Sequence, residues 1–581
     1  MVCTKCGSDN LDEAIYCGKC GSTIVNLAEI AASTQESAAK SPAPDQRAPG
    51  RSGKKLLLIT GIAAILVVLG VAAFAVIRNF GRPNTEDSRF YYTDSPLLVT
   101  GEEETLIYNG SSKPVTIKGR YVCSAFSMDR KKCVILVDRD NNETGTLYYF
   151  DGAKAKELSE DVFLFTISAD GSGVAYLTDP KENFNGTLNL YDASRDKSRE
   201  VADDASAYMT LSPDGNSIAY ISYSDQPDQG SGMESFTSYI SVNGKAAELL
   251  DSDTLVIGLA NDAKYVYYLK SETDWQAELT LYVRHGKINN ELGSTELDFP
   301  FTFNRDLSEI LYSDNENMYL SKAGEKRIAA DRFLGFLYVP YNSQMSNLSS
   351  DTINFHFAMY NIKELTGQSY LYKDSDGLRV GYLDQELSFS ETNAIPGILD
   401  RQTQWTADGK GLYYPDDTGR LQYLKDVSDP DAKPVEIESD HFAQRFVVTS
   451  DQSVIYFVDM TGTLWIKKGD SDAVAAAEKV MDNMLTLASD GQGLYFIADS
   501  ARNKETGNDS GTLSYLSGSP DAKVIEIADN VEYVTVSEAG VVYYVFSEKA
   551  QYEYLYEAFY SGDGKNFSSV MDNAFLEIIG N

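Results

Sequence analysis

A pattern of short, alternating hydrophobic segments separated by small polar turns recurs along most of this chain, from about residue 98 onward. Its clearest copies read ISADGSGVAYLTD from residue 167, LSPDGNSIAYISYS from 211, WTADGKGLYYPDD from 405 and LASDGQGLYFIADS from 487. Alternation with a period of two, bounded by a D-G turn, is typical of half-buried strands. The turns carry an acidic residue every 39 to 48 residues, with one gap of double length, at Asp129, Asp170, Asp214, Asp262, Asp306, Asp408, Asp451, Asp490 and Glu538.

A second element follows many of these turns by about fifteen residues and reads GTLYYFD, GTLNLYD, GRLQYLK, GTLWIKK or GTLSYLS. Gly at a hairpin turn followed by a strand fits each copy. Four antiparallel strands per repeat of about 40–45 residues predict β-propeller blades. We therefore expect a mainly β fold of about eight to ten such units, in one ring or two. The double gap predicts a degenerate unit near Asp351. Residues 104–119 look like the later strands of a blade, and NAFLEII at 573–579 is expected to supply its missing earlier strand.

The stretch from Ser212 to Tyr220, SPDG followed by IAY, resembles the TolB-type (PD40-type) repeat of bacterial propellers. No Trp-Asp dipeptide marks the repeats, so a WD40 assignment is not supported. A turn aspartate can accept hydrogen bonds from its own backbone. We therefore interpret the repeated aspartates as structural.

Four cysteines near the amino terminus, Cys3, Cys6, Cys17 and Cys20, form two C-x-x-C pairs, each followed by glycine. Two such pairs can place four thiolates around one tetrahedral zinc ion. Disulfides and redox-active pairs are the alternatives, but redox motifs normally accompany a βαβ pattern. Residues 3–24 resemble the short zinc ribbons that begin many bacterial membrane proteins. The resemblance implies one structural Zn²⁺ and a possible docking module for a cytoplasmic protein.

A membrane anchor is predicted between these cysteines and the repeats. Residues 25–54 are rich in Ala, Ser, Pro and Gly and predict a flexible linker. Leu56 to Ile77 is uncharged and would extend roughly 33 Å as a helix, which is enough to cross a bilayer. The run lies too far from the terminus for a signal peptide. We therefore divide the chain into a zinc ribbon (1–24), linker (25–54), transmembrane helix (55–78), juxtamembrane segment (79–97) and repeat domain (98–581).

Charge determines the expected orientation and excludes one class of partner. Arg47, Arg51, Lys54 and Lys55 precede the span, which places the amino terminus in the cytoplasm and the repeat domain outside the cell. The formal net charge of the chain is −36, with six acidic and nine basic residues before residue 83. The repeat domain is therefore strongly acidic and should repel nucleic acid.

A search for chemistry in the repeat domain finds no recognised catalytic motif. His285, His356 and His441 are far apart, and neither a G-x-S-x-G elbow nor a phosphate-binding loop occurs. Ser194 and Lys197 match S-x-x-K within a turn, which we attribute to chance. Two further features remain to be placed. The run of Asp138, Asp140 and Asn142 reads as a hairpin tip or, less well, a calcium loop. Cys123 and Cys133 could form a disulfide across a hairpin.

These observations predict a non-enzymatic, single-pass membrane protein whose external propeller binds or senses an unknown protein or polysaccharide. The alternative is an extracellular hydrolase or lyase acting on carbohydrate or peptide, with carboxylates at the mouth of the propeller channel. Fold alone does not decide between them, because function depends on sites.

Overall fold

The computed structural model describes residues 96–575, apart from 111–112, 141–142, 182–184, 224–235, 272–278, 296–300, 305, 315–316, 323, 331–332, 339–344, 347–359, 363–367, 375–376, 384–388, 392–402, 407–408, 417, 430, 439, 482–483, 518–521 and 551–552. The chain divides into two compact units, Met1–Gly81 and Arg82–Asn581. The first unit lies wholly outside the described residues. Within the described part, no helix is long and apolar enough to cross a membrane, and the predicted span from Leu56 to Ile77 lies outside that part.

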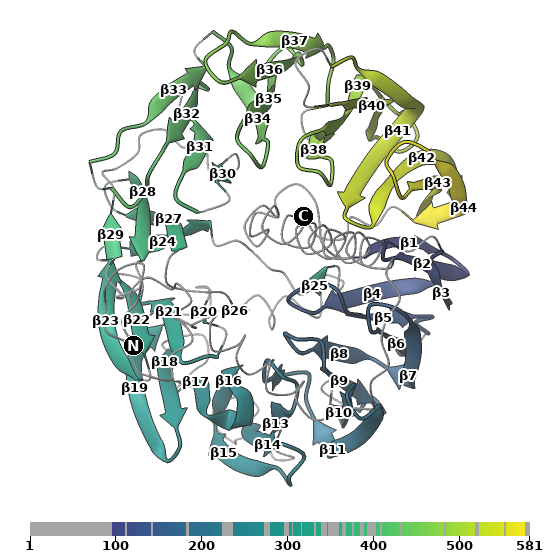
Figure 1. Cartoon of the computed structure of the whole chain (residues 1–581). Coiled ribbons are helices and arrows are strands. Elements are labelled where there is room, and N and C mark those ends of the chain that lie inside the picture. The colour runs from purple at the N-terminus through teal and green to yellow at the C-terminus, as the bar shows by residue number, and fades with distance from the viewer. Residues whose placement is uncertain are drawn as a thin grey trace, which may run out of the picture. The chain divides into compact units, whose positions relative to one another are not determined.

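The second unit is mainly β and consists of antiparallel sheets that follow one another along the chain (Figure 1). The first four sheets contain, in order, β4 (Tyr121–Phe126), β5 (Cys133–Val137), β6 (Gly145–Phe150) and β7 (Ala155–Val162); β8 (Leu164–Ile167), β9 (Gly173–Thr178), β10 (Gly186–Asp192) and β11 (Lys197–Ala205); β12 (Met209–Leu211), β13 (Ser217–Tyr223), β14 (Phe236–Val242) and β15 (Glu248–Ser252); and β16 (Thr254–Leu259), β17 (Tyr265–Ser271), β18 (Leu279–His285) and β19 (Ile288–Thr295). A single 3₁₀ turn, η2 (Asn261–Ala263), lies between β16 and β17.

The next four sheets repeat this order of strands. They contain β20 (Phe301–Phe303), β21 (Glu309–Ser313), β22 (Met318–Lys322) and β23 (Glu325–Ala330); β24 (Phe333–Tyr338), β27 (Gln368–Asp374), β28 (Gly377–Leu383) and β29 (Phe389–Glu391); β30 (Gln404–Trp405), β31 (Leu412–Pro415), β32 (Leu421–Leu424) and β33 (Val435–Glu438); and β34 (Ala443–Val448), β35 (Val454–Asp459), β36 (Leu464–Lys468) and β37 (Val474–Ala477).

The last sheet is continuous over ten strands and joins the two ends of the described chain. It contains β38 (Thr486–Leu487), β39 (Leu494–Arg502), β40 (Asp509–Leu516), β41 (Ile525–Ser537), β42 (Gly540–Ala550), β43 (Glu553–Ser561), β44 (Ser568–Phe575), β1 (Leu97–Gly101), β2 (Glu104–Tyr108) and β3 (Val115–Lys118). The first half of β41 pairs with β40 and its second half with β42, and β44 likewise pairs with β43 before its end meets β1. The ten strands therefore form three blade-like groups.

The terminal strands close the fold as the sequence predicted. Thr100 and Gly101 of β1 pair with Phe575 and Ala574 of β44, so the purple and yellow ends of the chain lie side by side (Figure 1). Residues 576–579 of the predicted closing strand lie outside the described residues. With eight smaller sheets and three groups in the large one, the described residues form eleven blade-like units, more than the eight to ten that we expected from the turns.

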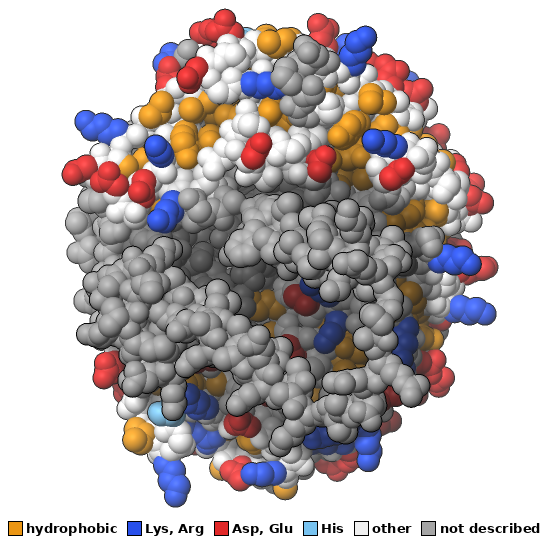
Figure 2. Space-filling model, in the orientation of Figure 1, with side chains coloured by type: hydrophobic (Ala, Val, Ile, Leu, Met, Phe, Trp, Pro, Cys, Tyr) orange, Lys and Arg blue, Asp and Glu red, His pale blue; other side chains and the backbone are white. Residues whose placement is uncertain are grey.

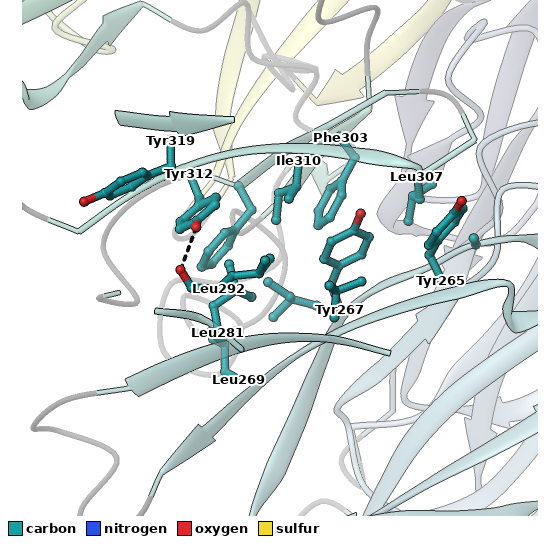
Figure 3. Close-up of a cluster of buried hydrophobic side chains, with 14 of the residues drawn as sticks. Tyr265, Tyr267, Leu269, Leu281, Leu292, Phe303, Leu307, Ile310, Tyr312 and Tyr319 are labelled. Carbon is teal, nitrogen blue, oxygen red and sulfur yellow. Dashed lines mark hydrogen bonds between the residues drawn. The ribbon is translucent and has the colours of Figure 1, made fainter. Parts of the chain in front are cut away.

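Hydrophobic clusters connect neighbouring sheets. One cluster joins the fourth and fifth sheets through Tyr267, Phe303 and Tyr312, each of which is almost fully buried (Figure 3). The Tyr312 hydroxyl donates a hydrogen bond to the carbonyl of Leu292 at 2.8 Å. Similar clusters join the sixth, seventh and eighth sheets to one another and the eighth to the ten-stranded sheet. Others join the three groups of that sheet and connect it with the first sheet. The series then continues from the first sheet to the fourth, and the cluster around Tyr267 extends it to the fifth. The packing is one continuous series, which favours a single ring over two.

The double-length gap holds a sheet and two extra strands. The sixth sheet fills the position of the predicted degenerate unit, and Asp351 itself lies outside the described residues. Between β24 and β27, strand β25 (Met345–Ser346) pairs with β4 of the first sheet, and β26 (Tyr360–Ile362) pairs in parallel with β20 of the fifth. The insertion therefore contributes strands to two sheets other than its own.

Aromatic pairs cross the second and third strands of many sheets at equivalent places. Tyr413 lies opposite Tyr423, with ring centroids 4.2 Å apart, and Tyr220 lies opposite Tyr239 at 5.5 Å. Such cross-strand pairs stabilise a sheet beyond the area they bury. They explain why the repeats place Tyr both after the D-G turn and after the G-T-L turn.

Candidate binding site at the loop end

The turns between the first and second strands of the sheets are capped by their own aspartates. In six of these turns, the carboxylate of the repeated Asp accepts a hydrogen bond from the backbone N–H two residues later, at 2.8–3.1 Å: Asp129, Asp170, Asp214, Asp306, Asp451 and Asp490. Asp408 lies outside the described residues. This confirms a structural role for these six aspartates.

Neighbouring turns of this kind also contact one another. The Met128 N–H donates to the Ala169 carbonyl at 2.7 Å, and the Asp170 N–H donates to the Pro213 carbonyl at 3.0 Å. The turns of successive sheets therefore lie at the same end of the sheets, which we name the tight-turn end.

The opposite end of the sheets carries connections of varied length. They include residues 224–235 between β13 and β14, 272–278 between β17 and β18, 392–403 between β29 and β30, and 503–508 between β39 and β40. Connections that vary on a regular scaffold are where binding residues usually lie. We name this the loop end, and it is where a binding site is expected.

One cluster of charged and aromatic side chains lies at the loop end between the seventh and eighth sheets. The buried carboxylate of Glu438 accepts a hydrogen bond from the Asp440 N–H at 2.9 Å, and its Oε1 lies 3.3 Å from Nδ1 of His441. The Nζ atom of Lys467, on β36, lies 3.4 Å from Oε2. An ionised carboxylate only accepts, so His441 must hold a proton on Nδ1 in this contact. A neutral His441 then has its lone pair on Nε2.

An indole and a second buried carboxylate complete the cluster. The ring of His441 lies 3.7 Å from that of Trp465, centroid to centroid. Trp465 donates from Nε1 to Oδ2 of Asp459 at 2.8 Å, while Oδ1 of Asp459 accepts from the N–H groups of Thr461 and Thr463 at 2.8 and 3.1 Å. The β35–β36 turn is therefore fixed by one carboxylate.

The carboxyl groups of this cluster are held in their ionised form. Burial opposes ionisation of Glu438, but the Asp440 N–H, His441 and Lys467 outweigh it and lower the pKa of Glu438. Burial likewise opposes ionisation of Asp459, yet its hydrogen bonds lower the pKa of that residue. Every described carboxyl group whose pKa departs from its ordinary value departs downward. These groups are therefore held as hydrogen-bond acceptors at neutral pH.

Two large hydrophobic side chains are exposed beside the cluster. Phe442 follows His441 and is 47% exposed, and Met460 follows Asp459 and is 77% exposed. Ala443 pairs with Asp459 across β34 and β35, so Phe442 and Met460 lie next to each other at the end of that hairpin. The site thus presents an apolar pair backed by fixed polar groups.

The other histidines singled out from the sequence do not join this site. His285 is exposed and stacks on Tyr265 with ring centroids 4.7 Å apart. His356 lies outside the described residues, as do the predicted zinc ligands Cys3, Cys6, Cys17 and Cys20.

The remaining sequence candidates belong to turns and to the core. The Asp192 carboxylate accepts from the N–H and hydroxyl of Ser194, so the S-x-x-K match is part of a turn, as expected. Asp138 accepts from the Arg120 N–H at 2.8 Å and Asp140 from the Thr144 N–H at 3.0 Å, which is the hairpin-tip arrangement; Asn142 lies outside the described residues.

No disulfide joins Cys123 and Cys133, so the predicted possibility of one is wrong. The two residues lie on adjacent strands but belong to clusters on opposite faces of the first sheet. Cys123 packs towards the second sheet and Cys133 towards β1–β3. Their side chains therefore point apart, which a disulfide does not permit.

Sequence reasoning missed Glu438, Lys467, Trp465 and the exposed pair of Phe442 and Met460. Glu438 and Lys467 are far apart in the sequence and meet only because the seventh and eighth sheets pack together. One local signal was available, since D-x-T-G occurs at both 416–419 and 459–462, where an aspartate caps the turn after the second strand.

Comparison with known proteins identifies the amino terminus. Residues 2–24 match the zinc-ribbon domain family, so the chain begins with a zinc-ribbon domain. No curated protein matches the chain.

Among solved structures, the chain is similar to the tricorn protease, with 12% identity, a TM-score of 0.30, and coverage of 83% of this chain and 58% of the protease. It is similar to dipeptidyl peptidase 4 of Porphyromonas gingivalis, with 9% identity, a TM-score of 0.33, and coverage of 74% and 65%. The β-propeller domain of the Trilobed protease from Pyrococcus furiosus gives 12% identity, a TM-score of 0.28, and coverage of 50% and 93%.

The expectation that this chain is not an enzyme is corrected by these comparisons. Peptidases are among the structures that resemble it, and a lyase with 10% identity and a TM-score of 0.27 is another. The lack of a recognised motif is therefore no reason to exclude catalysis. The low TM-scores assign no activity to the chain.

Proposed function

We propose that this chain is a single-pass membrane protein with a cytoplasmic zinc ribbon and an extracellular propeller that binds a ligand at its loop end. The membrane part of the proposal is supported by the uncharged run from Leu56 to Ile77 and by the basic residues before it. The cytoplasmic placement of the zinc ribbon fits the need of its thiolates for a reducing compartment.

The varied connections at the loop end carry the proposal, because binding residues usually lie on such connections of a regular scaffold. At the tight-turn end, the polar groups of the turns are used within and between neighbouring turns. At the loop end, the connections vary, Phe442 and Met460 are exposed, and Asp459 fixes the β35–β36 turn that carries Met460. A rigid hairpin with exposed apolar side chains loses little entropy on binding.

Site-specific photocrosslinking in intact cells tests the proposal. Full-length protein carrying benzoylphenylalanine at position 442 is compared with protein carrying it at position 474, where Val474 is 64% exposed at the tight-turn end. We expect covalent adducts at position 442 and few at position 474. Adducts of equal yield at both positions, or at neither, would refute binding at the loop end.

A further inference from the structure

Phe442 and Met460 form a small, preorganised apolar surface, which we name the Phe442–Met460 surface. Phe442 lies over Gly419, where an added Cβ would be 3.3 Å from the Phe442 side chain. The Ala443 N–H donates to the Gly419 carbonyl at 2.9 Å, which fixes β34 against the β31–β32 turn. Phe442 is thus positioned against the β31–β32 turn, while Met460 is 77% exposed on a turn whose backbone is fixed by Asp459.

The polar groups around this surface are already used in internal hydrogen bonds. The hydroxyls of Thr461 and Thr418 donate to Asp459 and Asp416, each at 2.6 Å. A polysaccharide needs several polar groups that are free to pair with its hydroxyls. The surface instead offers an aromatic ring and a flexible thioether, which suit an apolar side chain.

The surroundings of the surface are acidic. Segments 416–420, 436–445 and 459–467 contain six acidic and three basic residues. Two of the basic residues are paired, Arg420 with Glu436 at 3.3 Å and Lys467 with Glu438 at 3.4 Å. The arc that holds the seventh to ninth sheets shows hydrophobic side chains with both acidic and basic ones among them (Figure 2). This charge favours a cationic partner.

We infer that the Phe442–Met460 surface binds an extended peptide segment of a partner protein, in which apolar side chains are flanked by Lys or Arg. The inference rests on the proposed binding at the loop end and adds the class of the ligand. The apolar side chains of the peptide contact Phe442 and Met460, while its cations are attracted by the net negative charge of the surrounding segments.

The test uses two fluorescein-labelled peptides with the same Leu-Phe centre, one flanked by lysines and one by glutamates. Fluorescence anisotropy measures their binding to the full-length protein in nonionic detergent, with empty micelles as the blank. We expect the lysine peptide to bind about tenfold more tightly than the glutamate peptide. The double variant Phe442→Ser with Met460→Ser should lower the affinity for the lysine peptide by about tenfold, because these two side chains are the proposed apolar contacts.

The matched control replaces two equally exposed aliphatic residues at the tight-turn end, Val435→Ser with Val474→Ser. We expect this variant to bind the lysine peptide as the wild type does. Equal binding of the two peptides, or equal weakening by both double variants, would overturn the inference. If benzoylphenylalanine at position 442 instead captures a polysaccharide in cells, the peptide inference fails while binding at the loop end stands.

Discussion

Gly173 and Gly215 bring two neighbouring turns so close together that neither position has room for a side chain. A Cβ on Gly173 would lie 2.5 Å from the Cα of Gly215, and the converse distance is also 2.5 Å. Gly215 additionally has a φ of +65°, which favours glycine. This contact connects the second and third sheets at the tight-turn end.

We predict that Gly173→Ala lowers the free energy of unfolding by about 3 kcal/mol, because the backbones of two turns must separate. Chemical unfolding followed by circular dichroism measures the loss. Gly286→Ala is the control, since Gly286 has a φ of +62° but nothing within 4 Å of an added Cβ. It should cost about 1 kcal/mol, from the backbone conformation alone. Equal losses in the two variants would show that the turns are not in close contact.

Glu438→Gln should destabilise the junction of the seventh and eighth sheets by about 2 kcal/mol at pH 7, because Lys467 and His441 lose a buried anion. The pKa of Glu438 is lowered in the folded state. Its contribution is therefore complete above its unfolded pKa of about 4.3 and is lost as the pH falls through the lower folded value. The variant should flatten the decline in stability over that acidic range.

Unfolding followed by tryptophan fluorescence at pH 7 and pH 3.5 checks this prediction, since Trp465 lies in the cluster. Glu436→Gln is the control on the same strand, where the pair with Arg420 is half-exposed and worth less than about 1 kcal/mol. An unchanged pH profile in Glu438→Gln would contradict the arrangement described here.

Both cysteines of the propeller should be recovered as thiols. Burial raises the pKa of Cys133, and both side chains are inaccessible in the folded protein. We expect no alkylation in native conditions and full alkylation after unfolding without a reductant. Trypsin separates the two residues, because Arg130 and Lys132 lie between them. A pair of tryptic peptides joined by a disulfide would refute the prediction.

The zinc-ribbon domain should bind about one zinc ion per chain through Cys3, Cys6, Cys17 and Cys20. Elemental analysis of the full-length protein measures the ratio of zinc to protein. Cys6→Ser with Cys17→Ser should abolish binding, since each C-x-x-C pair loses a ligand. Cys123→Ser is the control and should leave the zinc content unchanged.

Protease added to intact cells should digest the propeller and spare a tag at the amino terminus. This follows from the orientation predicted for the span from Leu56 to Ile77. Immunoblots for tags at the two ends measure the outcome, with lysed cells as the control for cleavage of the amino-terminal tag. Protection of both tags in intact cells would exclude an extracellular propeller.

The repeated part of the fold could be predicted because its signals are local. Each turn aspartate bonds to a backbone group two residues away, and each G-T-L hairpin depends on its own glycine. The strands β25 and β26 could not be predicted in this way, since two or three residues carry no periodicity and their partners β4 and β20 lie in distant sheets. The number of units was underestimated because β41 and β44 each belong to two groups of strands.

The candidate site was missed for the same physical reason. Glu438 and His441 are three residues apart, but no motif marks them, and Lys467 meets Glu438 only when two sheets pack. Exposure of Phe442 and Met460 likewise depends on the register of β34 and β35. Sequence patterns report periodic burial well, but they do not report which polar groups from different sheets meet.

Because β1 pairs with β44, the propeller cannot close until this last described strand has been synthesised. Thr100 and Phe575 are 475 residues apart, and the ribosome adds about 5–20 residues per second. The first strands to emerge must therefore wait roughly half a minute to a minute and a half, with an open edge, before their partner exists. During that interval, the unpaired edge of β1 must be kept from pairing with other nascent chains on the same messenger RNA. A truncated product that lacks β44 would keep this unpaired edge permanently.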